Sequence, residues 1–153
     1  ADKIAINTIA LDNLDFITES SNIFGSQCIV CSIDVKFVDN EYKVFNKFKG
    51  ILDINPLELA LKYEKYGAGE ILLTSVDHEG STKGYDIELI RKFNNKLGIP
   101  VILNGGMGKP EHAVEAINNG ADAVAAAYIF HFSQYTPNDI KNELNQFNIE
   151  VRM

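Results

Sequence analysis

Short apolar runs alternate with amphipathic segments along most of the chain. Five apolar runs predict strands, at Lys3–Ile6, Cys28–Ile33, Glu70–Val76, Val101–Leu103 and Ala123–Ala127. Between them, apolar residues recur every three or four positions, which is typical of helices packed on a core. These segments predict helices over 11–24, 56–66, 86–97, 110–119 and 137–147, with a short helical segment at Ile129–Phe132. Strands that are apolar on both faces and alternate with helices predict a parallel sheet in an α/β fold.

Two segments depart from this alternation. Two short runs, 35–38 and 42–45, flank the turn pair Asp39-Asn40, which predicts a hairpin inserted after the second strand. The tail, residues 149–152, alternates apolar and polar residues, and we expect it to pack on the base of the fold.

Polar residues end nearly every predicted strand, which favours a barrel over an open sheet. These residues are Asn7, Asp34, Asp77 and Asn104. An open doubly wound sheet usually concentrates its site at one switch point, whereas a (β/α)8 TIM barrel gathers residues from many strand ends. The segment ADKIAIN at Ala1 also resembles ADAVAAA at Ala121, as if they were equivalent strands of two half-barrels. We therefore expect residues 1–153 to be the carboxyl-terminal part of a single, partial TIM-barrel domain, with strands four to eight present and the first strands missing.

Composition limits the classes of function. The chain has 153 residues, 46% of them hydrophobic, and a formal net charge of -7. The acidic balance argues against nonspecific binding to nucleic acid or anionic membranes, and the apolar runs are too short to span a bilayer. We expect a cytoplasmic protein with no nucleic-acid or membrane partner. The lysines of the hairpin region are most simply a solvated face, although they could dock a partner: Lys36, Lys43, Lys47 and Lys49.

The two cysteines have the spacing C-x-x-C, at Cys28 and Cys31. That spacing occurs in redox and zinc sites, but here both residues fall in a predicted strand, where positions three apart face opposite sides. We interpret them as small core residues, and we predict neither a metal nor a cofactor.

Two aspartates and two glycine-rich loops are the strongest candidates for chemistry. Asp34 and Asp77 each follow an apolar strand, where partial burial can raise the pKa of a carboxyl group and suit it to proton transfer. The loop after Asp77 contains Gly80 and Ser81, and the loop after the next strand contains Gly105 and Gly106. Backbone N–H groups in such loops can approach an anion, which predicts phosphate binding.

The three histidines show no ligand spacing. We expect His112 to lie on the surface of a helix and His131 to be a packed or hydrogen-bonded structural residue. His78 lies in the loop after Asp77 and could touch substrate.

Several motifs together resemble the cyclase subunit of imidazole glycerol phosphate synthase. The motifs are INT at Ile6, SIDVK at Ser32, GAGEILLTSVD at Gly67, GYD at Gly84, GGMGK at Gly105 and IFHF at Ile129. The resemblance implies a (β/α)8 barrel that takes ammonia from a glutaminase subunit and uses it on a small molecule carrying two phosphates. It also implies that one catalytic aspartate is Asp34, whereas the family's other catalytic aspartate lies on a strand absent here. We therefore expect little cyclase activity from this chain alone.

The resemblance also assigns binding residues. It implies that Asp77 is the aspartate of the family's sixth strand, that one phosphate site falls on Asn7 and Thr8, and that the other falls on glycines and backbone: Gly80, Gly106, Ala127 and Tyr128. The substrate end departs from the family in the sequence His78-Glu79-Gly80-Ser81 and at Tyr128, where the family has a serine. Two alternatives therefore stay open: a paralogue that supplies ammonia for acetamidino modification of surface sugars, and an inactive barrel fragment that self-associates.

Overall fold

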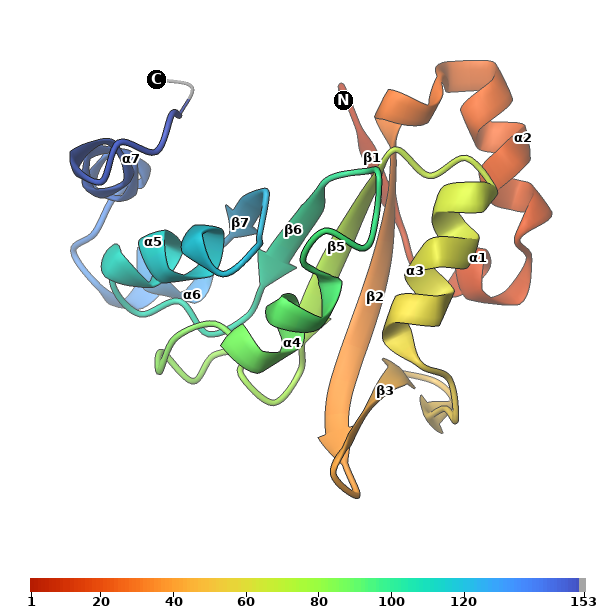
Figure 1. Ribbon diagram of the computed structural model, residues 1–153, viewed down its shortest axis with the longest axis horizontal. Helices are drawn as coiled ribbons and strands as arrows, with labels where there is room; N and C mark the ends of the chain where they lie inside the picture. Colours follow the sequence, from red (N-terminus) through yellow and green to blue (C-terminus); the bar gives the residue numbers. More distant parts are fainter. Residues whose placement is uncertain (152–153) are drawn as a thin grey trace.

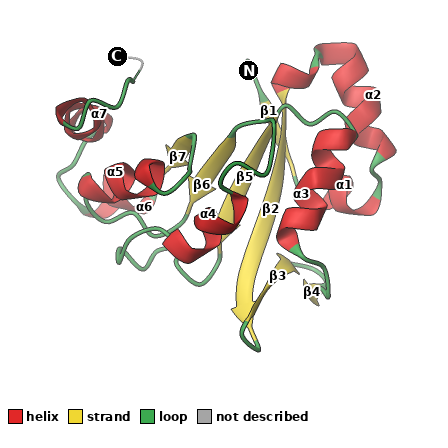
Figure 2. Cartoon of the chain, viewed as in Figure 1, coloured by secondary structure: helices red, strands yellow, loops and turns green. Residues whose placement is uncertain are grey.

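The computed structural model describes residues 1–151 and has the expected alternation of strands and helices (Figures 1 and 2). The strands are β1 (Ile4–Ile6), β2 (Ile29–Val38), β3 (Glu41–Asn46), β4 (Gly50–Ile51), β5 (Glu70–Ser75), β6 (Val101–Asn104) and β7 (Ala123–Ala125). The helices are α1 (Thr8–Asp12), α2 (Asp15–Phe24), a 3-10 turn η1 (Ser26–Cys28), α3 (Pro56–Lys65), α4 (Ile87–Phe93), α5 (Glu111–Asn118), α6 (Tyr128–Phe132) and α7 (Pro137–Gln146).

A mainly parallel sheet forms the centre of the molecule. Its parallel strands follow the order β1-β2-β5-β6-β7, so each strand lies beside the next parallel strand along the chain. The antiparallel strands β3 and β4 extend from β2 beyond the end of β1. Helices pack along one face of this sheet, as Figure 1 shows for α3 and α4. This is the arrangement of consecutive βα units that the sequence predicts.

The two faces of the sheet carry different side chains. Cys31, Ile33, Leu73 and Leu103 are almost completely buried on the face toward the helices. The intervening positions form two rows on the other face. One row is mostly apolar: Ser32, Leu72, Ile102 and Ala123. The other row lies nearer the carboxyl ends of the strands: Asp34, Thr74, Asn104 and Ala125. The second row places polar groups of three strands at one level.

The inserted hairpin is confirmed, and β2 continues directly into it. Asp39 and Asn40 form the turn and both have positive φ, at 52° and 63°. Two positive φ values in a two-residue turn suit the right-handed twist of the flanking strands. The expected strand Cys28–Ile33 is therefore longer at its carboxyl end, and it lacks Cys28. That residue lies in η1, because Gly25 ends α2 with φ 86° and the chain turns once before β2.

The single helix expected over 11–24 is wrong. The chain forms α1 and α2 instead, separated at Asn13 and Leu14. The side chain of Asn13 accepts a hydrogen bond from the backbone N–H of Asp15, at 3.1 Å. Asparagine bonded to a backbone group two residues on favours a turn over a continuous helix.

The tail contacts the core through residues 149 and 151. Ile149 and Val151 are partly buried against the core, whereas Arg152, the last residue of the expected segment, lies outside the described residues. None of the helices within residues 1–151 combines the length and the apolar character needed to cross a bilayer.

Candidate active site

Asp34 is held by a side chain from the neighbouring strand end. Asn7, which directly precedes α1, donates a hydrogen bond from Nδ2 to Asp34 Oδ2 at 2.9 Å. Burial raises the pKa of the Asp34 carboxyl group, and the bond from Asn7 opposes that shift. Within residues 1–151, Oδ1 of Asp34 has no hydrogen-bond partner. A half-buried carboxyl group with one fixed and one free oxygen can exchange a proton with a bound molecule.

Thr8 is positioned through the hairpin. Asn46, at the end of β3, is 2% exposed and donates from Nδ2 to Thr8 Oγ1 at 3.3 Å. Its Oδ1 accepts the backbone N–H groups of Phe48 and Lys49. Sequence reasoning did not single out Asn46, because its burial depends on packing of the hairpin against α1. Asn7 and Thr8, which follow β1, thus form one polar group with Asp34 in the middle of β2.

A polar bridge continues this group across the sheet. Asn104 Nδ2 donates to Thr74 Oγ1 at 3.2 Å, and Thr74 lies opposite Asp34 in the strand register. Neither Thr74 nor Asn104 was among the predicted binding residues. The sequence nevertheless indicates both residues, because Thr74 is a polar residue inside an apolar strand and Asn104 lies at the end of the next strand.

The predicted phosphate loops surround a hollow of about 250 Å³, called the loop hollow below. Its lining includes the predicted residues Gly80, Gly105, Gly106, Ala127 and Tyr128, together with Glu79, Asn104, His131 and Phe132. The rings of Tyr128 and Phe132 stack with centroids 4.3 Å apart. Ser81 does not line this hollow. Its hydroxyl oxygen accepts the backbone N–H of Lys83 within the loop instead.

A backbone contact joins the two glycine loops. Gly84 donates its N–H to the carbonyl oxygen of Gly106 at 2.9 Å. Gly106 has φ 108°, and a Cβ atom there would lie 2.1 Å from the Gly84 carbonyl oxygen. Only glycine fits this close approach, so the two loops have fixed relative positions.

Asp77 lies apart from Asp34 and contacts the hairpin. Its Oδ2 accepts the backbone N–H of Phe37 at 2.9 Å, and its Oδ1 is 3.9 Å from Lys36 Nζ. The carboxylate therefore fixes the hairpin to the loop after β5. The lysines of the hairpin region are less free than a solvated face suggests, because Lys43 also pairs with Asp53 at 3.0 Å and Lys49 with Asp12.

Two expectations about histidines are wrong. His112 is partly buried rather than on the surface, its Nδ1 accepts the N–H of Gly108 at 3.1 Å, and burial lowers its pKa. His131 is exposed rather than packed, because α6 places it at the edge of the loop hollow. The burial of His112 depends on a segment distant in sequence, because Gly84 lies against its ring.

The cysteines and acidic residues do not form a metal centre in the described part of the chain. Cys28 and Cys31 are free thiols, and burial raises the pKa of Cys31 to about 12. Among residues 1–151, no three His, Cys, Asp or Glu side chains are grouped so as to hold a metal ion.

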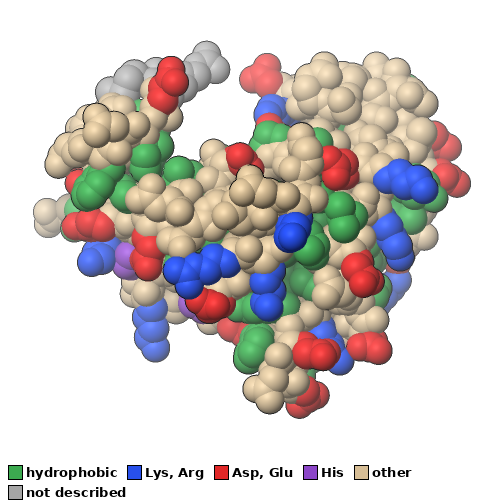
Figure 3. Space-filling model, in the orientation of Figure 1, with side chains coloured by type: hydrophobic (Ala, Val, Ile, Leu, Met, Phe, Trp, Pro, Cys, Tyr) green, Lys and Arg blue, Asp and Glu red, His purple; other side chains and the backbone are tan. Residues whose placement is uncertain are grey.

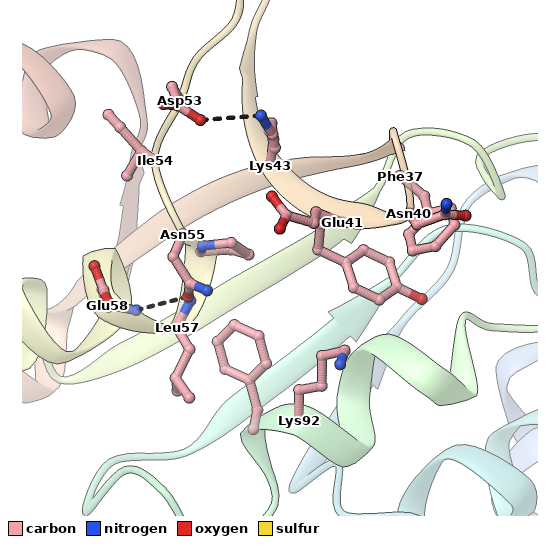
Figure 4. A pocket seen from close by; sticks show the side chains of 13 residues that line it. Phe37, Asn40, Glu41, Lys43, Asp53, Ile54, Asn55, Leu57, Glu58 and Lys92 are labelled. Atoms are coloured by element: carbon pink, nitrogen blue, oxygen red, sulfur yellow. Dashed lines mark hydrogen bonds and ion pairs between the residues drawn. The ribbon is translucent and has the colours of Figure 1, made fainter.

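Another hollow lies outside this site, between the hairpin and the helices α3 and α4. It measures about 640 Å³, and none of the predicted site residues lines it. Figure 4 shows Lys43 turned toward Asp53 on its rim and Asn55 turned toward the start of α3. In Figure 3, basic and acidic side chains are interspersed across the lower part of the molecule.

Comparison with known proteins assigns the chain to a family. The family model described as "Histidine biosynthesis protein" matches residues 1–136. The chain belongs to this family. Its α/β fold with a mainly parallel sheet is consistent with the family's (β/α)8 barrel.

Two curated members of the histidine biosynthesis family are close relatives. The "Putative imidazole glycerol phosphate synthase subunit hisF2" of Campylobacter jejuni is 60% identical over 153 residues, which are 100% of this chain and 61% of that protein. The "Imidazole glycerol phosphate synthase subunit HisF" of Leptospira biflexa is 44% identical over 157 residues, which cover 100% of this chain and 62% of that protein. The chain thus spans less than two thirds of the length of these relatives.

Proposed function

We propose that the protein carrying this chain is the ammonia-using cyclase subunit of imidazole glycerol phosphate synthase, a lyase of histidine biosynthesis. Family membership and the names of both relatives support this activity over acetamidino modification of surface sugars. We also propose that residues 1–153 form the carboxyl-terminal part of a single barrel domain, and that the protein works in the cytoplasm.

The observation that carries the proposal is the environment of Asp34. Its Oδ2 is fixed by Asn7, its Oδ1 accepts no hydrogen bond from the described residues 1–151, and burial raises its pKa. A raised pKa keeps the carboxyl group protonated to a higher pH than an exposed aspartate, so both protonation states become accessible nearer neutrality. Asp34 therefore serves as a general acid or base for the substrate bound at the carboxyl ends of the strands.

The substrate carries two phosphates, and the chain offers two places for them. Asn7 and Thr8 bind one beside Asp34, while the glycine loops with Gly80, Gly105 and Gly106 bind the other with the backbone near Ala127. Gly105 and Gly106 have no side chains that could cover their backbone N–H groups, and both line the hollow between the loops, which supports this role. Asp77 and Ser81 hold the loop and hairpin around the substrate. Ammonia comes from a glutaminase partner of the class I amidotransferases.

Turnover by the full-length protein tests the proposal. The protein receives ammonium and the two-phosphate ribonucleotide, and product absorbance is followed. Asp34→Asn keeps an acceptor for Asn7 but cannot transfer a proton, so we expect a loss of at least about 100-fold in kcat. Asp39→Asn makes the same chemical change at the hairpin tip and should retain activity. A folded wild-type protein without turnover, or an active Asp34→Asn variant, would refute the proposal.

We further propose that the 153-residue chain self-associates when it is isolated. Within residues 1–151, β1 pairs only with β2 and β7 pairs only with β6, so each has one unpaired edge. Unpaired edges are templates for pairing with another chain.

A further inference from the structure

The carboxylate of Asp86 joins four segments beside the candidate active site. It is 7% exposed and caps α4 by accepting the N–H of Leu89 at 3.0 Å. The same oxygen, Oδ1, accepts the hydroxyl of Tyr42 from β3 at 2.8 Å. Oδ2 accepts the hydroxyl of Ser75 from the end of β5 at 2.9 Å. The fourth segment is the glycine loop after β5, from which His78 approaches.

His78 lies between Asp86 and the backbone of its own loop. Its Nδ1 is 2.9 Å from the carbonyl oxygen of Gly84, and its Nε2 is 3.8 Å from Asp86 Oδ2. A carbonyl oxygen can only accept, so Nδ1 carries a hydrogen. In the neutral ring Nε2 then presents a lone pair to the carboxylate, whereas in the protonated ring it presents an N–H. A carboxylate has about four lone-pair positions, so Oδ2 can accept from His78 in addition to Ser75.

We propose that His78 is a positioning residue whose protonation pairs it with Asp86 and fixes the loop 77–84 against the candidate active site. This proposal rests on the proposed function only for its effect on substrate. The link to the site runs through Gly84, which accepts from His78 and donates to Gly106. Protonated His78 thus steadies the contact that holds Gly80 beside Gly105 and Gly106.

Charged groups of several elements lie near His78. Asp77 and Glu79 flank it in the loop, and Asp86 and Glu88 face it from the start of α4. Lys36 lies 3.9 Å from Asp77, Arg91 pairs with Glu88 at 2.7 Å, and Tyr42 is a neutral donor to Asp86. His112 of α5 lies against Gly84 and has a lowered pKa. Histidine side chains in general change charge between about pH 5 and 8, so a comparison of pH values across that range tests whether the pairing depends on protonation.

Amide hydrogen exchange in the full-length protein tests this role without requiring activity. We expect protection of the Ser81 and Gly84 amides, corrected for the intrinsic rate, to be about threefold greater at pH 6 than at pH 8, which suits a half-exposed ion pair. His78→Gln removes the charge and Asp86→Asn removes its partner, so each should abolish this difference. His131→Gln removes an exposed histidine of α6, outside the loop 77–84, and should leave the difference unchanged. A wild-type difference that persists in His78→Gln would overturn the proposal.

Two further readouts separate positioning from simple loss of folding. If His78→Gln does not fold, the wild type is studied by NMR across the same pH range. The chemical shift of the Gly84 amide should then change with pH in step with the signals of the His78 ring. A Gly84 amide that does not follow the ring refutes the role. In the cyclase assay, His78→Gln should raise KM severalfold at pH 6 and leave kcat nearly unchanged. An equal loss in kcat would contradict a positioning role. An inactive wild type would instead refute the proposed function, while the exchange data would still decide the role of His78.

Discussion

Gly106 shows at the scale of one residue how the two glycine loops constrain each other. Gly106→Ala would combine φ 108° with a Cβ atom 2.1 Å from a backbone oxygen. We expect the free energy of unfolding to fall by about 2–4 kcal/mol, because neither the backbone nor the neighbour can shift cheaply. Urea unfolding at constant m-value measures the change.

Gly50 supplies the matched control for Gly106. It has φ 77°, but nothing lies within 4 Å of a Cβ atom placed there. Gly50→Ala should therefore show the conformational penalty alone, about 1 kcal/mol. Equal losses in the two variants would contradict the steric account of the loop contact.

Single residues were predictable from sequence only where the strand pattern decides their place. Asp34 follows an apolar strand, so its location at the carboxyl end of the sheet could be expected. The polar positions Thr74 and Asn104 were visible in the sequence, but their hydrogen bond could not be expected, because it depends on the register between two strands. The burial of His112 was misjudged because the glycine that lies against it, Gly84, is distant in sequence. The exposure of His131 was misjudged because it depends on the orientation of the short helix α6. Residues chosen for phosphate binding stay predictions, although several of them line one hollow.

At the scale of elements, α3 offers a direct test of how a helix beside the hairpin begins. Asn55 Oδ1 accepts the backbone N–H groups of Leu57 and Glu58 at 2.9 and 3.2 Å. Asn55→Ala leaves both donors without this acceptor, so we expect a loss of about 1 kcal/mol in the free energy of unfolding. Asn55→Asp retains the acceptor and should stay within about 0.5 kcal/mol of wild type in the same thermal or urea experiment. Similar losses in both variants would rule out the cap as the cause.

Most elements with strong periodicity were predicted with nearly correct bounds, although the helix expected over 86–97 ends at Phe93, and short irregular elements were not predicted. The strand at Glu70 and the helix at Pro56 differ from their expected ends by one residue. The break between α1 and α2, the turn η1 and the short strand β4 went unrecognised. Each is only a few residues long and is decided by one side-chain bond or one glycine, so periodicity carries no signal for it.

At the scale of the whole molecule, the unpaired edges of β1 and β7 predict association of the isolated 153-residue chain. Light scattering should give a mass above the 17.0 kDa of one chain. Ile4 is 43% exposed in β1, and Ile4→Lys adds a charge of the kind that protects natural edge strands. We expect this variant to associate less. A wild-type chain that stays monomeric would contradict the proposal.

Strand β2 runs without a break from the parallel sheet into the hairpin, and this affects how the chain can fold. The first part of β2 pairs with β1 and β5, which lie far from it in sequence, whereas its last part pairs with β3 only a few residues away. Closing a short loop costs less chain entropy than closing a long one. The hairpin half of β2 is thus the least costly part to order, and its pairing begins at Asp34. Asp34, the residue proposed for proton transfer, therefore lies at the boundary between the locally paired hairpin and the part of the sheet that joins segments distant in sequence.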